Sequence, residues 1–291
     1  MLEHVAGIPV ARTPAEVRAW VAAARTQGKR IGLVPTMGAL HAGHLTLVQT
    51  AREHAEAVIV SIFVNPMQFG PREDFSAYPR PFEADCARCL AGGVDLVYAP
   101  SPEVMYPEGF ASHAEVTGLT EGLCGASRPT HFRGVTTVVL KLLNIAMADV
   151  AVFGEKDFQQ LQVLRRLAED LDHPTRILGG AIARESDGLA MSSRNVYLTA
   201  EERSRAPAIL RALHEAKLQA QAGVESPSSV RQSIIGAITA AGGRVDYVEL
   251  VDPRTLTPVA DFAGPTRAIV AAWFGKARLL DNLALVDQAG A

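Results

Sequence analysis

Apolar residues in the first 185 positions occur in short runs, and longer amphipathic segments separate these runs. The run at 57–64 is apolar on both faces, which is typical of a central parallel strand. Thr13-Pro14-Ala15-Glu16 combines a cap residue, a proline at the first helical position and a glutamate three residues after the cap, so it predicts a helix that ends at Gly28. The repeated order of strand, loop and helix predicts an α/β fold with a parallel sheet. The expected strands are 31–34, 57–64, 94–98, 150–153 and about 175–183; the expected helices are 13–28, about 43–56, about 81–91, one opening at 128–134 and ending near 148, and one ending near 171.

The pattern changes near Ser186. Residues from Val245 to Leu250 alternate between apolar and polar, which predicts a half-exposed antiparallel sheet. We therefore expect an N-terminal domain over residues 1–186 and a smaller α+β domain over residues 187–291. Helices are expected in the second domain at about 200–221 and 227–241, and strands at 244–252, 266–274 and 277–281; in the first domain, residues 100–130 are rich in Pro, Gly, Ser and Thr and predict an irregular excursion with a short strand at 113–117.

The composition narrows the function classes. The formal net charge of −3, without any run of Lys and Arg, provides no electrostatic footprint for nucleic acid or an anionic membrane. No apolar run is long enough to span a bilayer, and the first ten residues do not resemble a signal peptide, so we expect a cytoplasmic protein. The three cysteines argue against a disulfide framework, and Cys86-x-x-Cys89 lacks a second ligand pair, so reduced thiols are expected.

The most informative stretch runs from Leu33 to His44. A buried strand breaks at Pro35, passes through a glycine-containing turn and reaches His41-x-Gly43-His44 where a helix begins. The first N–H groups of a helix have no intrahelical partners, so an anion finds donors there, and histidines three apart face the same side. This arrangement suits a polyphosphate. The structural alternative is that the two histidines only cap the helix.

Polar residues follow the other strand ends, where open α/β sheets bind ligands. Asn65 and Gln68 are neutral hydrogen-bonding groups, with turn chemistry as the alternative reading. Lys156 follows a strand end, where its charge suits a phosphate, and Gln160 lies on the same side of the helix. The alternative is that Lys156 is a solvated surface lysine. Arg128 and His131 either face an anion or are solvated. The loop Met191-Ser192-Ser193-Arg194 predicts an anion clamp, or a linker.

These motifs resemble known enzymes. The histidine element and the 191–194 loop resemble the paired signatures of class I aminoacyl-tRNA synthetases and related nucleotidyltransferases. The whole chain resembles the pantoate–β-alanine ligase (pantothenate synthetase) family. The motifs that carry this resemblance are Pro35-Thr36-Met37-Gly38 with the two histidines, Ser61 to Phe69, Tyr78-Pro79-Arg80, Arg128 to Phe132, Phe153 to Gln160, and Asp187 to Asn195.

The resemblance implies a Rossmann-like, doubly wound parallel sheet of the HxGH nucleotidyltransferase type, followed by a small lid domain. It implies that ATP and pantoate form pantoyl adenylate and pyrophosphate, that β-alanine then displaces AMP, and that the enzyme is a cytoplasmic homodimer using Mg²⁺. It places metal-side contacts around Asp85 but assigns no metal ligand, because Pro81-Phe82 departs from the Thr-rich helix start of that family.

The resemblance also implies roles for individual residues. The catalytic residues would be His44, His41 and Lys156. ATP would be bound by Met37, Gly38, Ala39, Leu40, His41, Ala42, Gly43, His44, Gly154, Glu155, Lys156, Asp157, Ala183, Met191, Ser192, Ser193 and Arg194. The substrates would be bound by Gln68, Gln160, Asn65, Tyr78, Arg128 and His131.

Two other function classes share part of this pattern. A tRNA-charging or cytidylyl-transferring relative would carry the same histidine element, but tRNA binding predicts a basic surface that this composition lacks. A non-catalytic nucleotide-binding module is the second alternative, and His44 and Lys156 speak against it.

Overall fold

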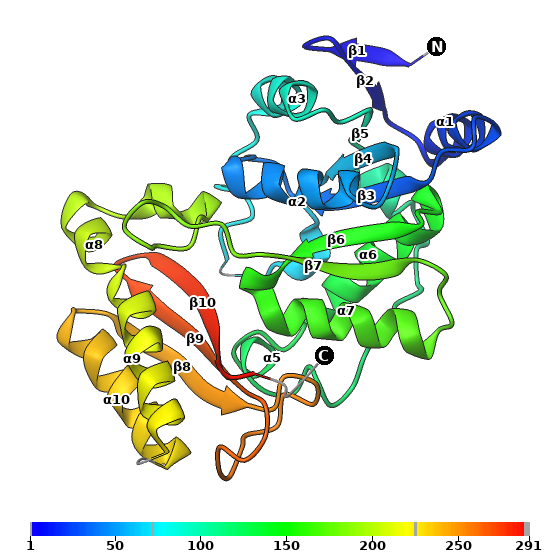
Figure 1. The fold of residues 1–291 in the computed structure, drawn as a ribbon. Coiled ribbons are helices and arrows are strands. Elements are labelled where there is room, and N and C mark those ends of the chain that lie inside the picture. Colours follow the sequence, from blue (N-terminus) through cyan, green and yellow to red (C-terminus); the bar gives the residue numbers. More distant parts are fainter. Residues whose placement is uncertain (1, 72, 224–225, 288–291) are drawn as a thin grey trace. The chain divides into compact units, whose positions relative to one another are not determined.

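The computed structural model describes residues 2–71, 73–223 and 226–287, in two compact units (Figure 1). The first unit comprises residues 1–155 and 160–181, and the second comprises residues 156–159 and 182–291. The short segment 156–159 thus makes its contacts mainly with the second unit, although it follows a strand of the first.

The first unit is built on a seven-stranded sheet of order β1-β2-β5-β4-β3-β6-β7. Only β1 runs antiparallel to its neighbour, and the other neighbours pair in parallel, which confirms the expected α/β fold class. The strands are β1 (Glu3–Val5), β2 (Ile8–Ala11), β3 (Ile31–Thr36), β4 (Ala57–Ile62), β5 (Leu96–Tyr98), β6 (Val150–Gly154) and β7 (Arg176–Gly180).

Helices cover both faces of this sheet (Figure 1). One face is buried by α2 and α3, whose Val48 and Cys89 share a core cluster with Val10, Val34 and Val60 of the strands. The opposite face is covered by α1 and α6, which pack against each other. The helices are α1 (Pro14–Thr26), α2 (Ala42–Arg52), α3 (Phe82–Ala91), α4 (Pro102–Met105), α5 (Cys124–Ser127), α6 (His131–Ala146) and α7 (Phe158–Asp170), with 3₁₀ turns η1 (Pro66–Gln68) and η2 (Glu155–Asp157).

The strand order reverses direction at β3. From β3 the chain proceeds outward through β4 and β5 on one side, and later through β6 and β7 on the other. The carboxyl ends of the two strands that flank such a switch point diverge and leave a crevice for a ligand. The histidine turn follows β3, and Gly154 ends β6, so two of the sequence motifs meet this crevice from neighbouring strands.

The second unit is a three-stranded antiparallel sheet of order β10-β9-β8 with two long helices against it. Its core joins Leu213 of α9 and Ile234 of α10 to Val248, Val270 and Leu279 of the three strands. The elements are η3 (Ser193–Tyr197), α8 (Ala200–Arg205), α9 (Ala208–Ala222), α10 (Pro227–Ala240), β8 (Arg244–Val251), β9 (Thr266–Phe274) and β10 (Ala277–Val286). This unit has the expected α+β class.

The structure differs from the sequence-based expectations at several elements. The pattern missed β1 and β2, which add an edge to the expected five strands. Residues 113–117 form no strand, because side chains of α6 satisfy their backbone: Thr137 accepts the N–H of Ala114 and Thr136 donates to its carbonyl. The expected helix 200–221 is two helices, since Pro207 interrupts it between α8 and α9.

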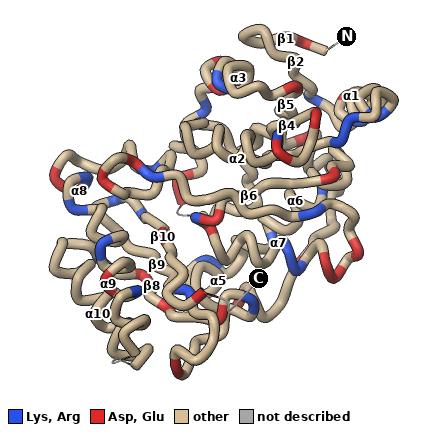
Figure 2. The backbone as a smooth tube through the Cα atoms, viewed as in Figure 1, with Lys and Arg blue, Asp and Glu red and all other residues tan. Residues whose placement is uncertain are grey.

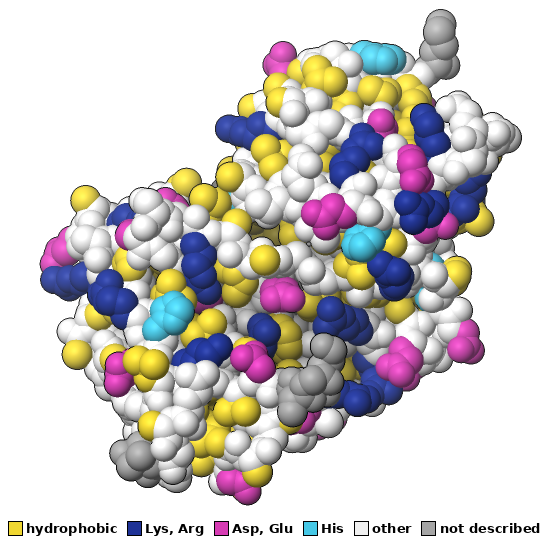
Figure 3. All heavy atoms as spheres, viewed as in Figure 1, with side chains coloured by type: hydrophobic (Ala, Val, Ile, Leu, Met, Phe, Trp, Pro, Cys, Tyr) yellow, Lys and Arg dark blue, Asp and Glu magenta, His cyan; other side chains and the backbone are white. Residues whose placement is uncertain are grey.

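Charged side chains of both signs are interspersed along each unit (Figure 2). On the face drawn in Figure 3, Lys and Arg alternate with Asp and Glu and do not gather in one patch. Among the residues that the structure describes, no helix combines the length and the apolar character needed to cross a membrane.

Candidate active site

A buried carboxylate holds the turn after β3 from behind. Asp85, in the first turn of α3, is 0% exposed and accepts the backbone N–H groups of Ala39 (2.8 Å) and Leu40 (2.8 Å). Gly38 and Ala39 have positive φ angles of 83° and 51°. A Cβ atom on Gly38 would lie 3.0 Å from an Asp85 oxygen, so both the backbone angle and the close approach favour glycine. Asp85 therefore fixes the path of the chain into the histidine motif.

His41 and His44 lie side by side at the start of α2, with ring centroids 4.1 Å apart. Nδ1 of His41 accepts the backbone N–H of Gly43 (3.2 Å), and Nδ1 of His44 accepts the backbone N–H of His41 (3.2 Å). The two rings do cap the helix, as the structural alternative predicted. A ring nitrogen that accepts a hydrogen bond carries no proton, so each neutral imidazole has its proton on Nε2. The capping bonds thus set both rings as Nε2–H donors.

This geometry corrects one part of the sequence argument, which expected open backbone donors at the helix start. The N–H of Gly43 is bound by His41, and those of Ala39 and Leu40 are bound by Asp85. These three groups are already satisfied within the chain. An anion at this turn would therefore meet imidazole N–H groups in place of those three backbone donors.

A hydrogen-bond chain orients the polar residues after β4. Asn65 is 1% exposed, and its Oδ1 accepts the Tyr106 hydroxyl (2.8 Å) and the backbone N–H of Met67 (3.2 Å). Its Nδ2 donates to the carbonyl of Gly134 (3.1 Å) and to Oε1 of Gln68 (3.1 Å). Burial raises the pKa of the Tyr106 hydroxyl, which keeps that group protonated and hence a donor. These four bonds allow the Asn65 amide only one orientation. Asn65 therefore does more than form a turn, which was the alternative interpretation of this residue.

The same chain fixes the Gln68 amide. Because Oε1 of Gln68 accepts from Asn65, its NH₂ group is the end available to a ligand. Nε2 of Gln68 lies 3.2 Å from the Met37 thioether, which is a weak acceptor. Gln68 is therefore set as a donor beside the histidine turn.

Arg128 and His131 hold the backbone of Gln68. Nη2 of Arg128 donates to the Gln68 carbonyl (3.1 Å), and Nδ1 of His131 donates to the same oxygen (2.9 Å). Nε of Arg128 also donates to Glu73 (2.7 Å), so the carboxylate that this arginine faces in the structure belongs to the protein. Burial opposes ionisation of Glu73, but the Arg128 guanidinium prevails and leaves the pKa of Glu73 below its ordinary value. Neither Arg128 nor His131 is merely solvated.

The other predicted residues of the first unit occupy separate positions. Gly154 ends β6, and Glu155 begins η2. Tyr78 is buried, with its ring 6.1 Å from that of Phe69 in an edge-to-face arrangement. Gln160 lies in the first turn of α7 and is half-buried.

Of the predicted substrate residues, the structure brings Asn65, Gln68, Arg128 and His131 into one hydrogen-bonded cluster, with Met37 beside it.

Lys156 and Asp157 belong to the second unit. Nζ of Lys156 lies 3.5 Å from a carboxylate oxygen of Asp157, and the lysine side chain is 23% exposed. This lysine is therefore largely covered and does not fit the alternative of a solvated surface residue.

The 191–194 loop is also part of the second unit. Oγ of Ser192 accepts the backbone N–H of Arg194 (3.2 Å) and caps η3. The N–H of Met191 donates to the carbonyl of Ala183 (2.9 Å), which closes a hairpin behind the loop. The loop thus has defined internal hydrogen bonds, which a simple linker between two domains would not need.

The cysteines carry no visible chemistry. Cys86, Cys89 and Cys124 are buried thiols. Burial raises the pKa of Cys86 to about 11 and that of Cys89 to about 12, so both stay as thiols near neutral pH. Within the described ranges, no group of three or more His, Cys, Asp and Glu side chains is arranged to hold a metal ion.

Comparison with known proteins identifies the family. The sequence profile of the pantoate–β-alanine ligases matches residues 9–284. A pantothenate synthetase of Myxococcus xanthus is 51% identical over 285 residues, covering 97% of this chain and 98% of its own. The chain belongs to the pantoate–β-alanine ligase family. This confirms the resemblance found in the sequence motifs.

Solved structures of the family agree. Pantothenate synthetase from Thermus thermophilus superposes with a TM-score of 0.90 at 46% identity, covering 96% of this chain and 99% of its own. The pantoate–β-alanine ligase of Francisella tularensis, described as a complex with β,γ-ATP and β-alanine, superposes with a TM-score of 0.81 at 32% identity, covering 96% and 98%. The Rossmann-like fold with a smaller C-terminal part is thus the fold of this ligase family.

Two residues that position parts of this candidate site, Asp85 and Tyr106, were not assigned from the sequence. Asp85 carried a signal, because a carboxylate directly before Cys86, in a helix whose cysteines lie in the core, needs a buried partner. Tyr106 carried none, since it lies in the irregular segment and bonds to a residue 41 positions away.

Proposed function

We propose that this chain condenses pantoate with β-alanine to give pantothenate, converting ATP to AMP and pyrophosphate. The observation that carries the proposal is the match to a pantothenate synthetase at 51% identity along nearly the whole of both chains. The Francisella tularensis relative, described as a complex with β,γ-ATP and β-alanine, supports ATP and β-alanine as two of the three substrates.

In the first step, a carboxylate oxygen of pantoate attacks the α-phosphorus of ATP. The bond to the α,β-bridging oxygen breaks, pyrophosphate leaves, and pantoyl adenylate remains. Both reactants are negatively charged, so catalysis consists mainly of positioning and of donors for the phosphate oxygens. His44 and His41 supply Nε2–H donors set by their capping bonds, and we assign His44 the catalytic role.

The second unit contributes the remaining phosphate contacts in this proposal. Lys156 supplies a point charge, and the loop Met191 to Arg194 supplies hydroxyl and guanidinium groups. Closure of the C-terminal residues 187–291 as a lid would exclude water and protect the adenylate from hydrolysis. Residues 37–44, 154–157 and Ala183 complete the proposed ATP site.

In the second step, the amine of β-alanine attacks the acyl carbon. The bond to the AMP oxygen breaks, AMP leaves, and the nitrogen loses a proton as the amide forms. A mixed anhydride is already activated, so this step needs a binding place more than a protein nucleophile. The buried, protonated state of the thiols of Cys86 and Cys89 accords with that.

The pantoate site is proposed around Gln68 and Gln160. Gln68 presents N–H donors, which suit the carboxylate and hydroxyl oxygens of pantoate better than the Met37 thioether that it now faces. Asn65, Arg128 and His131 support it through the bonds described above. Tyr78 completes the proposed substrate contacts.

In this proposal Mg²⁺ enters together with ATP. The described residues contain no cluster of three or more metal-ligating side chains, whereas Mg²⁺ is commonly held by substrate phosphates and water with one or two carboxylates. No step above depends on it. The homodimer, the cytoplasmic location and the absence of nucleic-acid and membrane partners stay predictions.

The first test is isotope exchange. If pantoate is activated before the amine is used, labelled pyrophosphate should enter ATP when pantoate is present and β-alanine is absent. Exchange that strictly requires β-alanine would rule out a free adenylate. A panel of other carboxylic acids and amino acids serves as control: stimulation by an amino acid in place of pantoate would favour a tRNA-charging relative, and exchange with none of the acids would favour a non-catalytic module.

The second test concerns the Gln68 amide. Tyr106→Phe removes one of the two donors to the Asn65 oxygen, so the amide of Gln68 is held less firmly, and KM for pantoate should rise about fivefold, the equivalent of one neutral hydrogen bond. Tyr98→Phe is the matched control, because its buried hydroxyl meets only a weak acceptor, the Met105 sulfur, 3.6 Å away. Equal KM values for pantoate in both variants would contradict the proposed orientation.

A further inference from the structure

Two of the proposed phosphate elements are attached to the same strand of the second unit. Asp281 and Asn282 are adjacent on β10 and are 3% and 1% exposed. Successive side chains of a strand point to opposite faces of the sheet, so one strand can hold a different segment on each face. We propose that Asp281 and Asn282 are positioning residues that hold the 191–194 loop and Lys156 in one fixed arrangement.

Asp281 holds the hairpin behind the loop. Nη1 and Nη2 of Arg184 donate to the two Asp281 oxygens at 2.7 and 2.8 Å, a bidentate pair that fixes the guanidinium plane. Nη1 of Arg184 also donates to the Gly188 carbonyl (3.0 Å) at the tip of the hairpin. Arg184 pairs with Ala190 across the hairpin, directly before the loop.

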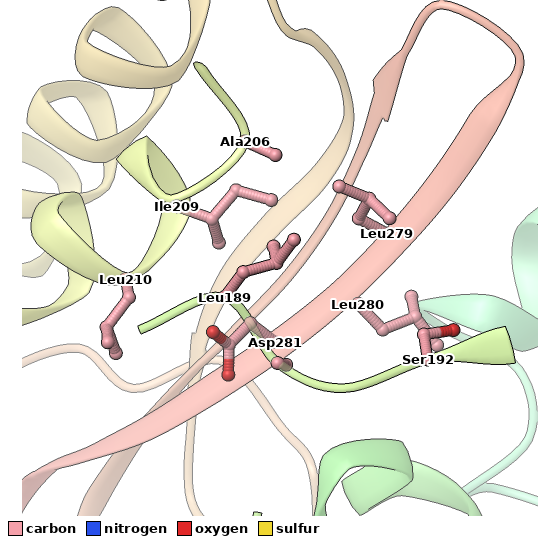
Figure 4. A pocket seen from close by; sticks show the side chains of 9 residues that line it. Leu189, Ser192, Ala206, Ile209, Leu210, Leu279, Leu280 and Asp281 are labelled. Atoms are coloured by element: carbon pink, nitrogen blue, oxygen red, sulfur yellow. The ribbon is translucent and has the colours of Figure 1, made fainter. Parts of the chain in front are cut away.

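The pocket beside this ion pair shows how close the loop lies to the strand. Asp281 and Leu280 of β10 line it together with Leu189 and Ser192, with Ile209 of α9 on the far side (Figure 4). The side chain of Leu189 is 3% exposed and belongs to the core of this unit. The loop is thus anchored by an ion pair and by an apolar contact at the same point.

Asn282 holds the segment that contains Lys156. Its Nδ2 donates to the carbonyl of Lys156 (3.0 Å), and its Oδ1 accepts from Nη1 of Arg267. The Arg267 guanidinium lies 4.0 Å from the centre of the Phe158 ring, a cation–π contact. The segment after β6 is therefore held at two points, the carbonyl of Lys156 and the ring of Phe158. These bonds explain why residues 156–159 belong to the second unit.

The consequence concerns catalysis. The orientation of the Lys156 ammonium depends on the turn that carries it, and a misplacement of about 1 Å at a reacting centre lowers rates up to a hundredfold. Because Asn282 and Asp281 are neighbours, the lysine and the serine loop keep a constant spacing. A charge and two hydroxyls thus meet the nucleotide as one preassembled set. This inference rests on the proposed function of Lys156 and of the loop.

The test is a double-mutant cycle on pyrophosphate exchange. Asn282→Ala should lower kcat about tenfold, by loss of the bond that orients Lys156. In a Lys156→Ala background the same change should lower kcat less than twofold, because the group it positions is gone. Asn282→Asp is a second variant that keeps the shape and the acceptor for Arg267 but removes the donor to Lys156, and it should match Asn282→Ala.

Asp246→Asn is the matched control. Asp246 accepts from Arg278 of the same strand β10 (2.7 Å) and its side chain is 22% exposed, so its loss tests a general weakening of the sheet. This control should shift the melting temperature and leave kcat unchanged. If Asn282→Ala and Asn282→Asp keep the parent kcat, or add fully to Lys156→Ala, the inference fails while the proposed function stands. If Lys156→Ala itself keeps the parent rate, the proposed role of Lys156 fails instead.

Discussion

Lys156→Ala and His44→Ala should each lower the rate of pyrophosphate exchange about a hundredfold, or about 3 kcal/mol of transition-state stabilisation. In the proposed first step, Lys156 supplies a positive charge for the phosphate oxygens, and His44 supplies an Nε2–H donor that its capping bond has oriented. Both effects should appear mainly in kcat, because these contacts strengthen as charge develops on the phosphate oxygens.

Controls for these two variants exist within the chain. Lys217→Ala removes a lysine of the same unit with similar cover, 30% exposed against 23% for Lys156. His54→Ala removes a histidine two residues beyond the end of α2. Both controls should exchange at the parent rate. Unchanged exchange in Lys156→Ala or His44→Ala, with circular dichroism like that of the parent, would contradict the assigned roles.

His44→Ala has a second, smaller effect that separates its two roles. The side chain caps α2 by accepting the N–H of His41, so its loss should lower the free energy of unfolding by about 1 kcal/mol. His44→Asn keeps a side-chain acceptor at this position and should restore much of the stability but little of the rate. A variant that regained both together would indicate that the histidine acts only as a cap.

The sequence predicted the framework well because its elements follow local rules. The capping box at Thr13 and Glu16 forms as expected, with Oγ1 of Thr13 accepting the Glu16 N–H and the carboxylate accepting the N–H of Thr13. The apolar run at 57–64 is the strand β4, four of whose six residues, Ala57 to Val60, are buried hydrophobic side chains. Periodicity and caps act over a few residues, so a single sequence records them.

The candidate site was predictable only at its motifs, because its support is non-local. Asn282 meets a residue 126 positions earlier, and Tyr106 meets one 41 positions earlier. No spacing rule connects such pairs. The pairing of β2 with β5 is also non-local, since the two strands are more than eighty residues apart, although β2 forms a local hairpin with β1 as well. Local patterns indicated the groups that we propose to act, and tertiary contacts decide how those groups are held.

The placement of Lys156 shows the same limit for domain boundaries. Its position after β6 predicted that it belongs to the first domain, residues 1–186. The structure assigns residues 156–159 by their contacts to the second unit. A domain boundary predicted from a change in periodicity cannot account for a segment that packs against a strand located much later in the sequence.

Gly134→Ala should damage both stability and pantoate use, because helix α6 approaches η1 without room for a side chain. A Cβ atom on Gly134 would lie 2.3 Å from the carbonyl oxygen of Met67 and 2.7 Å from the backbone nitrogen of Gln68. Backbone atoms cannot rotate away as a flexible side chain can, so η1 must shift. The Gly134 carbonyl also accepts from Asn65, which orients Gln68. We expect a loss of about 3 kcal/mol in the free energy of unfolding and a rise of at least tenfold in KM for pantoate.

Gly236→Ala provides the opposite case. Gly236 lies in the interior of α10 with no atom within 4 Å of an added Cβ, so alanine there should stabilise its unit by about 1 kcal/mol through helix propensity alone. The two units can be followed separately, because Trp20 lies on α1 and Trp273 on β9, and a Trp→Phe change at either leaves one reporter. Urea titration in these backgrounds should show the transition of the first unit falling in Gly134→Ala and that of the second rising in Gly236→Ala. If Gly134→Ala unfolds at the parent urea concentration and keeps the parent KM for pantoate, then the close packing of α6 against η1 does not position Gln68.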